Sequence, residues 1–129
     1  MDARFEPRPK TLPPSMRTKG RYLIFEIFSE NPVEYQEIRE SFWNSITNFL
    51  GELGTSDAHP IILKNLYDPK SQRGVIKCRH DMVEQIRTSL VLVSMIGESR
   101  AVVRIDGVTG TIKSARNKYL GMRDLRSFK

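Results

Sequence analysis

Three cations near the end of the chain are the residues whose types and spacing most directly suggest chemistry. Lys113, Arg116 and Lys118 follow a turn that contains Gly107 and Gly110. Glycine lets a backbone approach a ligand closely, a helix start presents free N–H groups to an anion, and Lys and Arg neutralise phosphates. The segment therefore predicts a phosphate-binding surface. The alternative is a strand, a turn and a basic helix that is simply exposed to solvent.

Positive charge is concentrated at the two ends of the 129-residue chain, whose net charge is +6. Residues 1–21 hold six Lys/Arg against two acids, residues 22–99 hold seven against eleven, and residues 100–129 hold eight against two. This segregation indicates a polyanionic partner, either nucleic acid or an acidic membrane surface. A membrane is disfavoured because the longest apolar run, residues 90–93, is too short to span a bilayer. We also expect no signal peptide.

No group of residues resembles a catalytic or metal-binding motif. One cysteine and two histidines make a structural zinc site very unfavourable, and neither a nucleophile elbow nor a P-loop is present. Cys78 and His80 flank Arg79, but strand alternation predicts both on the side covered by helices, which favours a buried, inert thiol. The lone cysteine fits a reducing compartment. We expect a cytoplasmic protein with no cofactor held by the chain.

The elements that must position these residues follow in the order β-α-β-β-α-β. Apolar and branched residues predict strands over residues 21–28, 59–67, 73–79 and 100–108. The order predicts an α+β fold, a ferredoxin-like or RRM-like βαββαβ sandwich with an antiparallel sheet. Two helices would cover one face of the sheet, and a short C-terminal helix would be appended.

Capping signals predict where the two main helices begin and end. The first would start with Asn31 as cap, Pro32 at the first helical position and Glu34 closing a capping box, and would end at Gly51 or Gly54. The second would run from residue 81 to about residue 96, before a glycine.

The chain length fits one domain with basic extensions. Residues 1–19 hold four of the seven prolines and read as a flexible basic arm. We expect the single sandwich domain to occupy residues 20–120 and a basic tail to occupy residues 121–129.

The sheet face away from the helices is predicted to be cationic. Period-two alternation puts Leu23, Phe25, Ile27, Ile76 and Cys78 on the helix side. The open face would then carry five cations, namely Arg73, Lys77, Arg79, Arg100 and Arg104. Such a surface is typical of phosphate binding, although Lys and Arg are also common on any exposed strand.

Base stacking on this face is disfavoured. An RNA-recognition motif stacks bases on aromatic residues of its central strands, but residues 73–79 contain none. Tyr22 and Phe28, with Ile24 and Val102, are expected to pack under the appended helix or a partner. The sequence therefore favours recognition of RNA backbone and shape.

The second helix carries more apolar residues than one core stripe needs. Met82, Val83, Ile86, Leu90 and Val93 form the stripe that packs on the core. On the opposite side, helical spacing gathers Val91, Leu92 and Met95. We predict that a protein partner or a second copy covers these three residues, the alternative being a helix buried on both sides.

Segments along most of the chain carry a family resemblance. They are residues 12–17, the strand 21–27, Gly51-Glu52-Leu53-Gly54, the run 73–79, the helix 83–93 and the turn 107–113. In this order and spacing they resemble the archaeal ribonuclease P protein component 2 family, whose eukaryal relatives are ribonuclease P and MRP subunits. The resemblance covers roughly residues 12–120.

The resemblance implies a subunit of the ribonuclease P holoenzyme, an endoribonuclease that removes the 5′ leader of precursor tRNA. Members of the family bind the catalytic domain of ribonuclease P RNA, which performs the cleavage with Mg²⁺. They also assemble with the TIM-barrel protein component 3 and pair with each other in a heterotetramer. No catalytic residues are then expected in this chain.

Two other functions remain open on the residues alone. The chain could be a stand-alone ferredoxin-like module that binds RNA or DNA without a ribozyme. It could also be a small metabolic or regulatory domain whose open face binds an anionic ligand.

Overall fold

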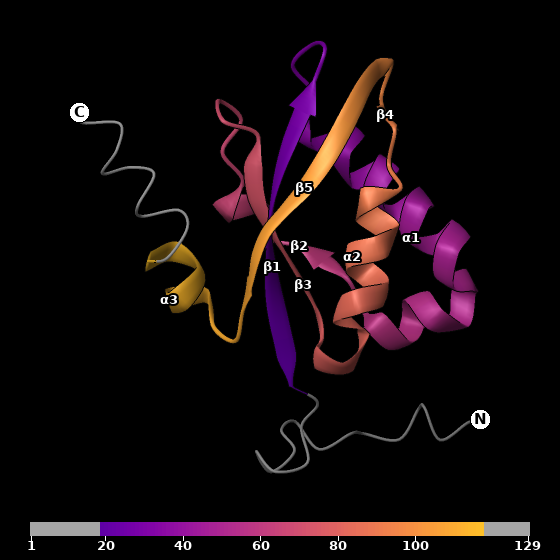
Figure 1. Ribbon diagram of the computed structural model, residues 1–129, viewed down its shortest axis with the longest axis vertical. Coiled ribbons are helices and arrows are strands. Elements are labelled where there is room, and N and C mark those ends of the chain that lie inside the picture. Colours follow the sequence, from indigo (N-terminus) through magenta and orange to yellow (C-terminus); the bar gives the residue numbers. More distant parts are fainter. Residues whose placement is uncertain (1–18, 118–129) are drawn as a thin grey trace, which may run out of the picture.

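The computed structural model describes residues 19–117, which form a sandwich of helices and one sheet (Figure 1). The elements are β1 (Gly20–Ser29), α1 (Tyr35–Ala58), β2 (Ile61–Ile62), η3 (Lys64–Leu66), β3 (Arg73–Arg79), η4 (His80–Met82), α2 (Val83–Val91), β4 (Met95–Ile96), β5 (Ser99–Thr109) and α3 (Ile112–Ala115). No helix in this described part is long and apolar enough to cross a membrane. Lys118 and the predicted tail lie outside the described residues, as does the predicted arm apart from its last residue.

The predicted ferredoxin-like topology is confirmed. The strands lie in the order β2-β3-β1-β5-β4 and every pairing between them is antiparallel. The four strands of the predicted βαββαβ unit are β1, β2, β3 and β5, and β4 is an added edge strand. α1 and α2 lie on one side of the sheet and α3 lies on the other (Figure 1).

The main core lies between the sheet and the two long helices. β1 contributes Leu23, Phe25 and Ile27, all buried as predicted. Phe25 meets Phe42 of α1 edge to face, with 5.0 Å between the ring centroids, an arrangement that aromatic rings favour. The same cluster includes Ile76 and Cys78 of β3, Ile38 and Ile46 of α1, and Ile86 and Leu90 of α2.

A smaller cluster on the other face fixes α3. Ile24 of β1, Val75 of β3 and Ala115 of α3 are buried together, and Tyr22 packs against them. The prediction that Tyr22 and Ile24 pack under the appended helix is therefore confirmed.

The first helix differs from its prediction at both ends. It begins at Tyr35, and the capping box joins Glu34 to Glu37, so the predicted start at Asn31 and Pro32 is wrong. Gly51 has a φ of 76° and kinks the helix without ending it. The helix resumes and ends at Ala58, where His59 (φ 51°) donates its backbone N–H to the carbonyl of Thr55.

The second helix is shorter than predicted. It ends at Val91, and the N–H of Val93 bonds to the Leu90 carbonyl in a tighter final turn. Met95 then belongs to β4, which pairs with the start of β5 across a turn that contains Gly97 (φ 60°). The turn makes a hairpin where a continued helix was expected.

The predicted strand over residues 59–67 is reduced to β2. Pro60 has no backbone N–H to donate to a ladder, and the Leu63 carbonyl accepts from the N–H of Leu66 as the chain enters η3. The strand therefore ends after two residues.

β5 contains a β-bulge opposite the middle of β1. Ile105 pairs with Phe25 and Gly107 pairs with Ile24, so Asp106 is an extra residue on β5. Ile105 and Val108 consequently both pack against the main core, although they are three residues apart. The bulge shifts the alternation of sides for the end of the strand.

Candidate nucleic-acid interface

The open sheet face holds alternating cations and carboxylates at its centre. Strand register places Glu26 of β1 directly between Arg73 of β3 and Arg104 of β5. The bulged residue Asp106 lies within reach of both arginines. The central part of this face is therefore an ion-pair network.

Arg73 is buried within that network. It is 6% exposed, its Nη2 lies 2.6 Å from Oδ2 of Asp106, and its Nε lies 3.9 Å from Oε1 of Glu26. A charge taken out of water needs such partners to offset its lost hydration. The prediction that Arg73 lies exposed among phosphate-binding cations is wrong.

Arg104 is exposed, but its guanidinium is hydrogen-bonded to two carboxylates. Its Nη2 donates to Glu26 at 2.9 Å and its Nε donates to Asp106 at 2.8 Å, and the Asp106 hydrogen bond raises the pKa of Arg104. The guanidinium carbon lies 5.1 Å from the ring centroid of Phe28. Phe28 and its cross-strand neighbour Val102 are otherwise exposed, so α3 does not cover them. The alternative, that a partner covers them, stays a prediction.

Two further cations of the predicted surface are also paired with carboxylates. Arg100 lies 3.1 Å from Glu30, and Arg79 lies 2.6 Å from Asp81. Hydrogen bonding from Arg79 lowers the pKa of Asp81. Exposed pairs of this kind are weak and open to exchange. The face is thus much less positive than its Lys and Arg content suggests.

Lys77 is the cation of the predicted sheet set that pairs with no carboxylate in the described part of the chain. Its side chain is exposed, and its ammonium lies 5.8 Å from the ring centroid of Tyr22, its cross-strand neighbour. Tyr22 also packs against the small cluster that anchors α3. This arrangement brings Lys77 and α3 to the same end of the sheet face.

α3 adds two more unpaired cations at that end. Thr111 caps α3 by accepting from the N–H of Ser114 at 3.0 Å, and Ala115 turns inward to the small cluster. Lys113 and Arg116 are exposed and have no carboxylate partner among residues 19–117. We call Lys77, Lys113 and Arg116 the α3-side cations.

The three predicted interface residues are exposed but do not share one helix face. Val91 is the last residue of α2, Leu92 caps it and Met95 lies on β4. Their exposed fractions are 59%, 59% and 46%. The predicted exposure of these residues is confirmed. The prediction that they share one face of a helix is wrong, and their role in a protein interface remains a prediction. We call these residues the α2–β4 patch.

The groups considered for catalysis are held in inert positions. Cys78 is buried, and burial, with a smaller effect of Asp81, raises the pKa of its thiol to about 11. The thiolate is the nucleophilic form, so Cys78 is unreactive near neutral pH. His80 is exposed on η4, which corrects its predicted place on the helix side. No group of three or more metal-ligating residues is present in the part of the chain described.

Sequence reasoning missed the carboxylates that neutralise the sheet. Alternation along β1 puts Glu26 on the same side as Tyr22 and Ile24, so one partner was visible in the sequence. Asp106 was visible as well, because the alternation that places Arg100 and Arg104 on the open face continues to Asp106; the bulge reverses the sides only after it.

Comparisons with known proteins agree with the resemblance found in the sequence. The model of the Rpp14/Pop5 family matches residues 21–120. The chain is 44% identical over 113 residues to ribonuclease P protein component 2 of Pyrococcus furiosus, which covers 88% of this chain and 92% of the relative. It is 38% identical over 111 residues to the component 2 of Methanosarcina mazei, which covers 86% and 92%.

A solved structure supports the fold independently. A chain of the cryo-EM structure of yeast ribonuclease MRP matches with a TM-score of 0.56 at 12% identity, covering 86% of this chain and 93% of that one. At this identity the likeness concerns the fold alone. The family match and the component 2 relatives, by contrast, span nearly all of the described domain. This chain belongs to the Rpp14/Pop5 family, which includes archaeal ribonuclease P protein component 2.

Proposed function

We propose that this chain is a non-catalytic protein subunit of ribonuclease P, which binds the catalytic RNA and supports 5′-end maturation of precursor tRNA in the cytoplasm. Its family and its component 2 relatives support the assignment. The structural observation that carries the RNA contact is the group of α3-side cations, because their charges are not cancelled by neighbouring carboxylates.

The α3-side cations suit phosphate contacts that do not read sequence. Two of the three are lysines, which act as mobile point charges, and all three side chains are exposed. Contacts to phosphates fix position and add affinity, whereas base edges carry the sequence information. In this proposal the RNA performs the cleavage with Mg²⁺, and the protein lowers the Mg²⁺ requirement by screening phosphate repulsion.

The proposal also assigns protein partners to the chain. The TIM-barrel protein component 3 and a second copy of this chain, joined in a heterotetramer, are the partners implied by the family. The α2–β4 patch supports this part, because three large apolar side chains cluster around one exposed helix end.

The RNA contact can be tested by removing the three α3-side cations together. Each phosphate contact adds about 0.7 to 0.9 to the slope of log K against log salt. Replacing Lys77, Lys113 and Arg116 with alanine should therefore weaken binding to the ribonuclease P RNA and lower the slope by about two. Filter binding across a salt series measures both quantities.

A matched control removes three cations from the helix side. Arg39 lies on α1, Arg87 on α2, and the ammonium of Lys64 lies over the Tyr35 ring of α1. Their replacement by alanine changes net charge equally and should leave the slope within about half a unit. Equal losses in both triple variants would mean that net charge, and not this site, binds RNA. Equal affinity for unrelated structured RNA would favour the stand-alone module.

A further inference from the structure

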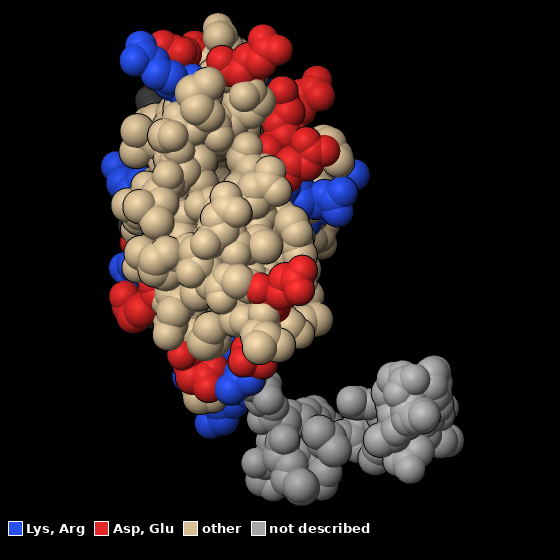
Figure 2. Space-filling view, turned by 90° about the vertical axis from the view of Figure 1, so that its right-hand side faces the viewer, with Lys and Arg blue, Asp and Glu red and all other residues tan. Residues whose placement is uncertain are grey.

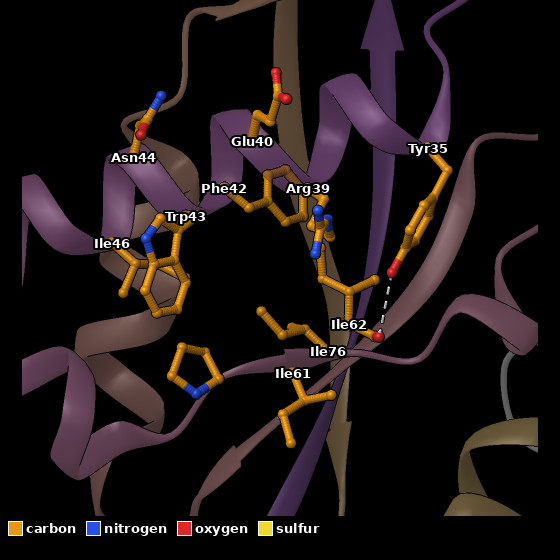
Figure 3. A pocket seen from close by; sticks show the side chains of 11 residues that line it. Tyr35, Arg39, Glu40, Phe42, Trp43, Asn44, Ile46, Ile61, Ile62 and Ile76 are labelled. Atoms are coloured by element: carbon orange, nitrogen blue, oxygen red, sulfur yellow. Dashed lines mark hydrogen bonds between the residues drawn. The ribbon is translucent and has the colours of Figure 1, made fainter.

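The outer side of α1 carries two adjoining hollows that the RNA contact does not use. The larger, about 660 Å³, lies between α1 and the edge strand β2, with Tyr35, Trp43 and Ile61 in its walls (Figure 3). The smaller, about 450 Å³, lies over the end of α1 and is lined by Thr47, Glu52, Thr55, Ser56 and His59. Trp43 and Pro60 line both hollows, which therefore adjoin. We call the two hollows together the Trp43 groove.

The groove lies within a broad surface that is mostly uncharged. Figure 2 shows this side of the molecule, with few charged residues over its centre and both acidic and basic residues toward its edges. Trp43 is 53% exposed, and Ile61, which also lines the larger hollow, is 42% exposed. Large apolar side chains gathered in this way are typical of a surface that another molecule covers.

The charges on α1 select the chemistry of the occupant. The helix carries four carboxylates, those of Glu37, Glu40, Glu52 and Asp57, against the single cation Arg39. Of these, Arg39 and Glu40 line the larger hollow and Glu52 lines the smaller, so unbalanced negative charge lies in the smaller hollow. That charge repels phosphates and attracts a cation. Glu52 lines the smaller hollow beside Trp43, whose ring face can also bind a cation.

We propose that the Trp43 groove binds a segment of another protein subunit that combines apolar residues with a Lys or Arg. The apolar part fills the larger hollow between Trp43 and Ile61. The basic side chain enters the smaller hollow and pairs with Glu52. This inference rests on the proposed function for the complex in which it occurs, but it concerns a surface separate from the α3-side cations.

The test uses the fact that Trp43 is the only tryptophan in the chain. Protein labelled with 5-fluorotryptophan gives one ¹⁹F signal, recorded first with ribonuclease P RNA alone and then with each other protein subunit of the same organism. We expect a shift with a protein subunit and none with RNA alone. A signal that is unchanged in a complex active in cleavage would overturn the proposal. So would a shift caused by RNA alone, or by raising the concentration of this chain alone.

Substitutions separate the two parts of the occupant. Trp43→Ala should weaken binding of the protein subunit by at least about tenfold, as expected for an interface aromatic. Glu52→Lys should weaken it by a similar factor through repulsion, with circular dichroism confirming the fold. Phe28→Ala removes a comparably exposed aromatic from the opposite face and should have no effect. If Phe28→Ala costs as much as Trp43→Ala, the groove is not the binding site.

These results remain separable from the proposed function. Trp43→Ala and Glu52→Lys should keep the RNA affinity and salt slope of the unmodified protein, because they lie on the helix side. If the protein binds no ribonuclease P RNA, the proposed function fails. If it binds RNA and joins an active complex while the ¹⁹F signal stays unchanged, only the groove assignment fails.

Discussion

Removing the carboxylate of Asp106 should destabilise the fold strongly, because it leaves the guanidinium of Arg73 buried without its closest partner. The two side chains are 7% and 10% exposed and are joined at 2.6 Å. Breaking a buried pair by deleting one member costs about 3 to 5 kcal/mol. Glu26, 3.9 Å from Nε of Arg73, retains part of the interaction, so we expect about 3 kcal/mol for Asp106→Ala.

The loss should come from the uncompensated charge and not from the missing attraction. Replacing both partners with apolar residues of similar size, as in Arg73→Met with Asp106→Leu, should therefore restore most of the stability. Urea unfolding followed by circular dichroism measures the free energies. With a typical slope for a small domain, Asp106→Ala should lower the urea midpoint by about 1.5 to 2 M.

A second measurement separates a structural Arg73 from one that contacts RNA. Arg73→Met should leave the salt slope of RNA binding unchanged when measured well below the unfolding midpoint. A slope reduced by about one would show that Arg73 contacts a phosphate. A loss below about 1 kcal/mol for Asp106→Ala would refute the reasoning about burial.

Three further predictions concern other parts of the fold. Replacing Leu92 and Met95 with Asp should abolish association with component 3 or with a second copy, as measured by analytical ultracentrifugation. The circular dichroism spectrum should stay unchanged. An unfolded variant would mean that these residues support the core. The unfolded thiol of Cys78 loses its proton above pH 9.0, whereas the folded thiol keeps it to about pH 11. The unfolded state then binds fewer protons, so stability should fall in that window by up to about 1.4 kcal/mol per pH unit relative to Cys78→Ala, as urea unfolding would reveal. Gly97→Ala should cost about 1 kcal/mol or more in thermal unfolding, because Gly97 has a φ of 60° and an added Cβ would meet the Glu37 carboxylate.

Local patterns predicted the elements that pack against the core. Alternation along β1 and the helical spacing of Ile38, Phe42 and Ile46 predict the buried faces, because one side of each element is continuously apolar. The same spacing also includes Phe49, which is 47% exposed. The predicted end of α2 lies too far along the chain, because Leu92 and Val93 continue the apolar pattern of the helix. Gly97 is the only signal of the hairpin in this part of the sequence. The predicted helix end at Gly51 is wrong because a glycine with a positive φ can either end a helix or kink it, and the sequence does not distinguish the two.

The candidate site was harder to predict because it depends on which charges meet. Alternation correctly predicted Lys77 on the open face. The prediction that Lys113 and Arg116 are exposed cations on a short helix after β5 is also confirmed. Lys118 lies outside the described residues, and its contribution remains a prediction. Whether an arginine is free depends on distant carboxylates: Arg73 is separated from Glu26 by 47 positions and from Asp106 by 33 in the sequence.

The bulge at Asp106 divides β5 into two parts. Side chains in the two parts alternate between the faces of the sheet in opposite phase. Thr109 pairs with Tyr22 because of the one added residue, and the chain therefore leaves β5 toward α3 on the open face. Deleting Asp106 would remove the bulge and leave Gly107, Val108 and Thr109 on their present sides, because each keeps its partner on β1. Inserting one residue between Gly107 and Val108 would instead shift the alternation, turn Val108 away from the core and direct the following segment toward the layer that α1 and α2 occupy. Such an insertion keeps every cation but would move Lys113 and Arg116 of α3 away from the open face. The length of the chain before α3, as well as its composition, determines where positive charge emerges.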